Sequence, residues 1–307
     1  MNIIIALMFM CCSVEGRIQI RQTGSSSVYP FAIKIAQEFS KKTDNICPFV
    51  ESTGTGSGFA DFSQTHNGFG YDITNASRPI NQKELAKCKK AGITSILEVC
   101  IGIDGIALAT KKNLTGFNAL RLNDLFTAIV KKIKNAKGEI IDNPYLKWNE
   151  INSNLPDLPI RILIPSQSHG SRNAFETMVM HENDVRSGIE VREISDYEAA
   201  DSHHLLFDFL DNNQATMAFV AANLLDNCVQ IKAMQIDGIE PTYSTIQNGT
   251  YPMVRKLFIY VREDTKTEGL QNYVDEWLSP AAIGKDGYLT KMGLVPLLEN
   301  VQRRRKL

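Results

Sequence analysis

One local pattern occurs at four separate places in the chain: a strand-like run ends in a loop of small hydroxyl and glycine residues, and a helix-like segment follows. The loops are TGSSS at residues 23–27, STGTGSG at 52–58, TNASR at 74–78 and SQSHGSR at 166–172. Each loop is dense in N–H and O–H donors, and a helix start adds unsatisfied N–H groups and a positive dipole end. Together they describe a cage for a small oxyanion.

The alternation of strands and helices predicts α/β lobes with mostly parallel sheets, whose ligands bind beyond the carboxyl ends of the strands. Three of the loops come from the first third of the chain and one from the middle, so we expect a cleft between two lobes. The expected strands are residues 17–21, 48–51, 71–74, 96–101, 105–109, 160–164, 215–220 and 257–261. The expected helices are residues 28–39, a short one through 59–62, one opening at 79–81, and 120–134, 172–181, 199–210 and 270–278.

Size and charge exclude some classes of protein. The chain has 307 residues, is 43% hydrophobic and carries a formal net charge of −1, which is enough for a large core. A near-neutral balance argues against a nucleic-acid binder, which would show a broad basic face. The one basic run, RRRK at residues 303–306, is interpreted as a solvated terminus.

The N-terminus carries an apolar run at residues 3–10, which is shorter than the roughly 20 residues that span a bilayer. The small residues Cys11, Cys12, Ser13 and Gly16 follow it, as in a secretory signal, although no Lys or Arg precedes the run. We therefore expect residues 1–16 to be a signal peptide; lipidation of Cys11 or Cys12 stays open. A cleaved signal implies folding in an oxidising compartment.

Cysteines beyond the signal are Cys47, Cys88, Cys100 and Cys228, which allow three pairings. No CxxC is present, so neither a zinc ribbon nor a thioredoxin-like site is expected. We expect a disulfide between Cys47 and Cys88, with buried free thiols as the alternative.

Several segments, in their order and spacing, resemble the phosphate-binding protein family, the periplasmic receptors of high-affinity ABC phosphate importers. They are residues 24–30, 51–59, 76–80, 143–145 with Trp148, 169–172 and 236–242. The resemblance runs from about Arg17 to about Pro296. Each motif alone is weak, but their order is specific.

The resemblance implies a two-lobed periplasmic binding protein of type II, with a two-strand hinge. We expect a discontinuous lobe I at residues 17–106 plus 243–307, and lobe II at 107–242. It implies a periplasmic monomer that holds dehydrated inorganic phosphate and delivers it to the transmembrane permease subunits of an ABC importer. No catalysis, cofactor or nucleic-acid partner is expected.

Carried over by position, the implied phosphate ligands are hydroxyls, backbone N–H groups and two arginines. They are Ser26, Ser27, Val28 (N–H), Thr55, Gly56, Ser77, Arg78, His169, Gly170, Ser171 and Arg172. The arginines carry the most weight because a planar guanidinium matches a tetrahedral oxyanion in two-point geometry.

The sequence departs from the family pattern at two positions. Ser77 stands where many members have a carboxylate that accepts the proton of monohydrogen phosphate. Unless Asp72, Asp104 or a backbone carbonyl replaces it, a receptor for another tetrahedral oxyanion such as sulfate remains an alternative. His169 stands in place of a hydroxyl; it would donate an N–H to the anion, point away, or make affinity rise as pH falls.

A phosphoester hydrolase is the alternative from a different class. It would need a nucleophile–base pair, but no GxSxG elbow is present, and Ser168 and His169 are neighbours in sequence rather than a relay. Residues 54–58 lack both the GxGxxG spacing and a Walker A lysine, which argues against a nucleotide. His203 and His204 point in different directions on a helix, so no metal site is expected there.

Overall fold

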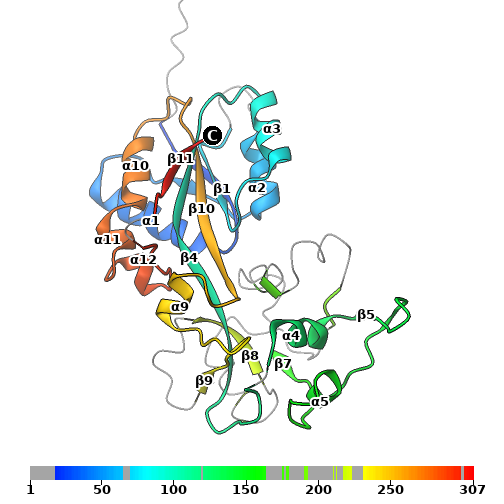
Figure 1. Ribbon diagram of the computed structural model, residues 1–307. Helices are drawn as coiled ribbons and strands as arrows, with labels where there is room; N and C mark the ends of the chain where they lie inside the picture. Colours follow the sequence, from blue (N-terminus) through cyan, green and yellow to red (C-terminus); the bar gives the residue numbers. More distant parts are fainter. Residues whose placement is uncertain are drawn as a thin grey trace, which may run out of the picture.

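The computed structural model describes residues 18–64, 70–118, 120–163, 175, 178–179, 190–192, 210, 212, 217–222, 231–298 and 301–307 (Figure 1). Residues 1–16, expected to be a signal peptide, lie outside this part, as do most of the helices expected at 172–181 and 199–210. Within the described ranges, no helix combines the length and apolar character needed to span a bilayer.

The molecule is built around a mixed sheet with the strand order β2-β1-β3-β10-β4-β8-β7. β9 and β11 also pair with β4. Its strands are β1 (Arg21–Gly24), β2 (Phe49–Val50), β3 (Ile73–Ala76), β4 (Ile96–Lys111), β7 (Ile162–Leu163), β8 (Met217–Ala221), β9 (Ile231–Ala233), β10 (Val254–Arg262) and β11 (Arg304–Lys306). A separate hairpin joins β5 (Lys132–Lys134) to β6 (Ile140–Asp142).

The α/β fold is confirmed, but the sheet is less parallel than the sequence predicts. β1 pairs in parallel with β2 and β3, and β7 with β8. β10 runs antiparallel to both β3 and β4, and β4 runs antiparallel to β8, β9 and β11. The expectation of mostly parallel sheets was wrong because β10, from late in the chain, inserts antiparallel between β3 and β4, and because β4 also runs antiparallel to its other partners.

β4 is one strand of 16 residues, where the sequence predicts two. Neither Gly102, which lies between the predicted strands, nor Gly105, the first residue of the second, interrupts it. A Cβ at Gly102 would lie 2.7 Å from the Leu294 side chain, and one at Gly105 would lie 3.1 Å from Ile246. These glycines permit close packing on the strand. β4 pairs with β10 through Gly105 and with β8 from Ile106 onward, and in Figure 1 it runs from the upper body into the lower.

The helices are α1 (Tyr29–Lys42), α2 (Thr55–Phe62), α3 (Gln82–Lys90), α4 (Leu122–Ile129), α5 (Trp148–Ile151), α9 (Tyr243–Gln247), α10 (Leu270–Trp277), α11 (Pro280–Ile283) and α12 (Tyr288–Lys291). The predicted capping box of α3 is present between Asn81 and Glu84. α4 ends at Ile129, earlier than predicted, because Val130 pairs with Val191 in a β-bridge.

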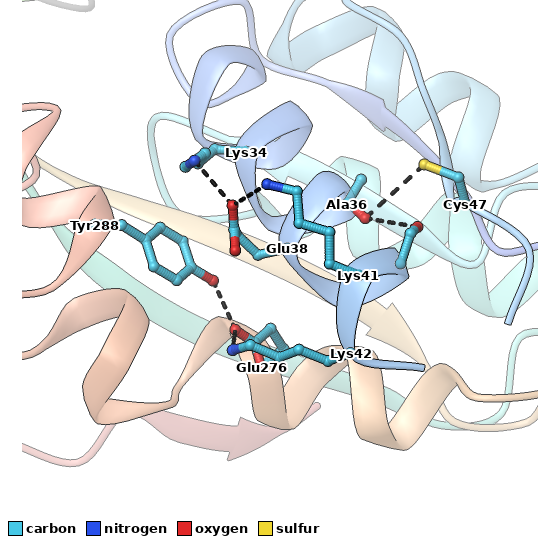
Figure 2. A network of polar contacts seen from close by, with 9 residues as sticks. Lys34, Ala36, Glu38, Lys41, Lys42, Cys47, Glu276 and Tyr288 are labelled. Atoms are coloured by element: carbon cyan, nitrogen blue, oxygen red, sulfur yellow. Dashed lines mark hydrogen bonds and ion pairs between the residues drawn. The ribbon is translucent and has the colours of Figure 1, made fainter. Parts of the chain in front are cut away.

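α1 and α10 cover one face of the sheet with the apolar sides that the sequence predicts. The buried residues are Ala32, Ile35, Ala36 and Phe39 of α1, and Leu270, Tyr273, Val274 and Trp277 of α10. A polar contact ties their ends together: Lys42 donates to Glu276 at 2.6 Å, and Tyr288 of α12 donates to the same oxygen at 2.8 Å (Figure 2).

The expected disulfide between Cys47 and Cys88 was wrong, since both are free thiols. Cys47 is exposed and directs its sulfur to the Ala36 carbonyl at 3.9 Å. Cys88 is buried in the core on the inner side of α3, so the two thiols lie in different surroundings. The alternative of a buried free thiol holds for Cys88 and Cys100. Cys228 lies outside the described residues.

The basic terminus is a strand rather than a free solvated tail. β11 pairs antiparallel with β4, with Arg305 opposite Glu98. Its side chains remain exposed, as expected, but its backbone covers the edge of the sheet, whose free N–H and C=O groups favour an added strand. The ion pairs are Arg304–Asp275 at 2.6 Å, Arg305–Glu98 at 3.0 Å and Lys306–Glu263 at 3.2 Å.

Candidate functional site

The first three loops come together at the carboxyl ends of three neighbouring strands. β1 is paired in parallel with β2 on one side and with β3 on the other, so their carboxyl ends point the same way. Each strand leads directly into one of the loops. The sequence-based expectation that these loops adjoin follows from this topology.

The first loop turns at Gly24, whose φ of +120° favours glycine; a Cβ there would lie 2.3 Å from the Asn75 carbonyl oxygen. Ser25 is buried and donates its N–H to that oxygen at 3.0 Å. The Ser25 carbonyl accepts the N–H of Val28 at 3.1 Å, so an anion at Val28 would have to share or displace this bond. Ser26 and Ser27 are half-buried in the turn before α1.

The second and third loops meet through two hydroxyls. Thr55 Oγ1 lies 3.1 Å from Ser77 Oγ and accepts the Ser77 N–H at 3.2 Å. Both residues are buried, with exposed fractions of 9% and 4%. Gly54, which precedes α2, has a φ of +88° and donates its N–H to the Gly24 carbonyl at 2.8 Å, which joins this loop to the first. Gly56 is exposed in the first turn of α2.

Arg78 directs its guanidinium toward α3. Its Nη2 donates to Glu84 Oε1 at 2.7 Å and its Nη1 to Glu84 Oε2 at 2.9 Å. Its guanidinium carbon lies 5.8 Å from the centre of the Phe59 ring. Glu84 therefore offsets part of the positive charge of Arg78, the residue that the sequence analysis expects to contact the anion.

Arg255 is a charged residue beside the first loop that the sequence interpretation missed. Its Nη2 donates to Ser27 Oγ and, at 3.1 Å, to Asp104 Oδ2; its Nε donates to the same Asp104 oxygen at 3.2 Å. The Arg255 side chain is only 6% exposed. It is the second residue of β10 and lies outside every loop motif. The local sequence signal was only that an arginine stands just before the predicted apolar strand at residues 257–261.

Asp72 and Asp104, the carboxylates considered for the missing acceptor, have different surroundings. Asp72 precedes β3, at the strand end opposite the loops, and it accepts bonds from the Arg21 N–H at 2.8 Å and the Thr267 hydroxyl at 2.6 Å. Asp104 shares Arg255 with Ser27 of the first loop. Asp104 is thus the nearer of the two to the candidate ligands.

His169, Gly170, Ser171 and Arg172 lie outside the described residues, so the structure does not place the fourth loop. The described half of the site presents neutral hydroxyl and amide donors, with its two arginines each held by a carboxylate. Among the residues that the structure describes, no three His, Cys, Asp or Glu side chains are grouped to hold a metal ion. Such a donor set suits a small anion.

Comparison with known proteins gives a match to the PBP superfamily domain over residues 13–281. The protein SphX of Synechococcus elongatus is 29% identical over 290 residues, which cover 92% of this chain and 78% of that protein. The phosphate-binding protein PstS of Staphylococcus saprophyticus is 26% identical over 270 residues, covering 85% and 76%.

Two solved structures are similar along nearly their whole length. A possible phosphate binding protein from Planctomyces limnophilus superposes with a TM-score of 0.72 at 26% identity, covering 92% of this chain and 94% of that one. An ABC-type phosphate transport receptor from Vibrio cholerae has a TM-score of 0.64 at 19% identity, covering 86% and 95%, and shows the shared fold.

Proposed function

The chain belongs to the PBP superfamily, and from this membership we propose that it is a receptor that binds inorganic phosphate between two lobes and delivers it to an ABC-type phosphate importer. The observation that carries the proposal is the meeting of Thr55 and Ser77. These two buried hydroxyls, from the second and third loops, lie beside the first loop with Ser27 and form a cluster of donors at the carboxyl ends of the strands. Relatives named for phosphate binding supply the identity of the anion.

The phosphate would be held mainly by neutral donors from both lobes, together with two arginines. Removing water from a dianion is costly, so many charge-assisted hydrogen bonds must replace it. The proposed ligands are Ser26, Ser27, Val28, Thr55, Gly56, Ser77 and Arg78 on one side, and His169, Gly170, Ser171 and Arg172 on the other. The contact of Thr55 with Ser77 and the position of Ser27 beside Arg255 support the first group.

The hinge of the proposed receptor includes β4. The change of partner from β10 to β8 at Ile106 supports the proposed division into lobe I at residues 17–106 plus 243–307 and lobe II at 107–242. The chain returns from the proposed lobe II to lobe I through residues 234–242, which hold one isolated β-bridge between Ile236 and Ile239. A phosphate that contacts both lobes favours the closed state, and closure is the signal to the permease subunits.

The site of action would be outside the cytoplasmic membrane, with residues 1–16 removed on export and the mature chain a monomer. The apolar run at residues 3–10 supports export. Terminal sequencing of the exported protein tests the cleavage, and sedimentation of the purified chain tests the monomer.

Sulfate is the second candidate ligand, and Ser77 in place of a carboxylate favours it. Retention of radiolabelled phosphate by the purified chain, with a large excess of sulfate as competitor, tests both candidates. We expect sulfate to leave phosphate bound; displacement by sulfate would support the alternative. Absence of hydrolysis of a chromogenic phosphate ester by the same sample is the expected result for a receptor rather than a hydrolase.

A further inference from the structure

Arg255 of β10 and Asp104 of β4 form an ion pair on neighbouring strands, and Arg255 also contacts Ser27 of the first loop. Arg255 lies opposite Asp104 in the antiparallel pairing of β10 with β4. The side chains are 6% and 22% exposed, so both charges are largely removed from water. Two guanidinium donors, Nε and Nη2, converge on one carboxylate oxygen, and Nη2 also reaches Ser27 Oγ.

A pair of this kind is poor at stabilising a fold. The desolvation of two charges offsets much of their attraction, and apolar residues of similar volume stabilise a core at least as well. Burial lowers the pKa of the Arg255 guanidinium, while Asp104 acts in the opposite direction. An arginine nevertheless stays protonated in proteins, so a positive charge is kept behind the loop.

The contact between Arg255 and Ser27 has only one direction. A guanidinium has donors and no acceptor, whereas a serine hydroxyl has one hydrogen and two lone pairs. Ser27 Oγ therefore accepts from Arg255, and its own hydrogen must point away from the guanidinium. Polarisation by a charged donor also makes the Ser27 O–H a stronger donor to a further acceptor.

We propose that Arg255, held in place by Asp104, is a positioning residue that turns the Ser27 hydroxyl into a fixed donor toward the bound phosphate. This inference rests on the proposed function, since it specifies how one ligand of that site is oriented. Ser27 contributes to phosphate binding only when Arg255 accompanies it, and the two residues act as one unit.

A double-mutant cycle on the purified chain tests this unit. In Arg255→Gln, the amide nitrogen occupies the bonded position of Nε, which faces Asp104, and the Nη2 group that reaches Ser27 is absent. In the wild-type background, Ser27→Ala is expected to weaken phosphate binding about tenfold to a hundredfold, the usual worth of a hydrogen bond to a charged group. In the Arg255→Gln background, Ser27→Ala is expected to change the Kd by less than about threefold.

Arg262 offers a matched control at the other end of β10. It is also paired with an aspartate, Asp264, at 3.2 Å and is 16% exposed. In Arg262→Gln, the effect of Ser27→Ala on the Kd is expected to keep its full size. Thermal unfolding of each variant shows whether it is folded. If Arg255→Gln does not fold, the same cycle is run in Arg255→Gln with Asp104→Asn, which leaves no unpaired buried charge.

The outcomes distinguish the proposed role of Arg255 from the proposed phosphate-binding function. Multiplicative effects of Ser27→Ala and Arg255→Gln, or phosphate binding by Arg255→Gln as tight as by the wild type, would overturn the role of Arg255 alone. Failure of the wild-type chain to bind phosphate would instead overturn the proposed function. Loss of the Ser27 effect in the Arg255 variants but not in Arg262→Gln supports the inference.

Discussion

The guanidinium of Arg78 meets both carboxylate oxygens of Glu84, with Nη2 to Oε1 at 2.7 Å and Nη1 to Oε2 at 2.9 Å. Glu84 also closes the capping box of α3, where its Oε2 accepts the Asn81 N–H at 3.0 Å. One carboxylate thus serves the helix start and offsets the charge of a proposed phosphate ligand. The two duties are separable by mutation.

Glu84→Gln is expected to tighten phosphate binding. Glutamine keeps an acceptor for the cap, but it removes a negative charge that competes for Arg78. The expected gain is about threefold in Kd, in line with a partly exposed pair worth roughly 0.6 kcal/mol. Calorimetric titration measures it, and the melting temperature should stay close to the wild type. Unchanged or weaker binding in a folded variant would contradict a competition between Glu84 and the anion for Arg78.

Thr55→Val should weaken phosphate binding and destabilise the fold. Valine has the same shape but lacks the oxygen that accepts the Ser77 N–H, so a buried donor loses its partner. We expect a loss of about 1–2 kcal/mol in the free energy of unfolding and at least a tenfold rise in the Kd for phosphate. Thr55→Ser is the matched control and should retain most of both. A valine variant that binds like the wild type would remove Thr55 from the site.

Glu38 should make the stability depend on pH in the acid range. Hydrogen bonds from Lys41 and Lys34, each at 2.9 Å, lower the pKa of Glu38 from 4.5 to about 2 (Figure 2). Because the folded pKa is the lower one, the ionised group stabilises the fold above about pH 4.5, and this contribution is lost as pH falls toward 2.

Melting temperatures of the wild type and Glu38→Gln, measured between about pH 7 and 2, test this prediction. The two curves should lie apart at neutral pH and converge on acidification. Glu268→Gln, a surface substitution outside the network, should run parallel to the wild type. A constant gap between the wild type and Glu38→Gln would contradict the shift.

Thiol reactivity should differ sharply among the described cysteines. Burial raises the pKa of both the Cys88 and the Cys100 thiol to about 11, so few thiolates form at pH 8, and the core excludes the reagent. Cys47 is exposed. Alkylation of the folded protein followed by peptide mass mapping should show Cys47 modified first, and Cys88 and Cys100 only on unfolding. A Cys47–Cys88 disulfide peptide would contradict the structure.

Removal of residues 303–307 should destabilise the molecule without abolishing its fold. The tail supplies backbone bonds from the Cys100 N–H to the Arg303 carbonyl at 2.8 Å and from the Leu307 N–H to the Ile96 carbonyl at 3.0 Å. We expect a loss of about 1–3 kcal/mol in denaturant unfolding. The triple variant Arg304→Ser, Arg305→Ser and Lys306→Ser keeps the backbone and should lose less, because exposed ion pairs contribute little. Equal losses would assign the stability to the charges.

Local signals account for what the sequence predicted correctly. Apolar spacing and Pro30 defined α1, and Asn81 with Glu84 marked the start of α3, because these features involve residues within a turn or two of each other. The clustering of the first three loops followed from the rule that parallel strands share a carboxyl edge.

Features that depend on distant partners were not predictable in this way. Arg255 reaches Ser27 across 228 positions, and no local pattern marks either residue as the other's partner. The terminal strand β11 and the early end of α4 likewise depend on pairing with remote segments, which overrode local preference. The free Cys47 and Cys88 show that cysteine count alone does not fix pairing.

Calorimetric titration of the purified chain with phosphate and, separately, with sulfate between about pH 5 and 8.5 tests whether the hydroxyl loops form a phosphate site. We expect a one-to-one complex with phosphate of micromolar or tighter Kd and much weaker binding of sulfate. Equal binding of sulfate would contradict selectivity for phosphate. No heat of binding with either anion, from a sample shown to be folded, would contradict the assignment of the hydroxyl loops to an oxyanion site.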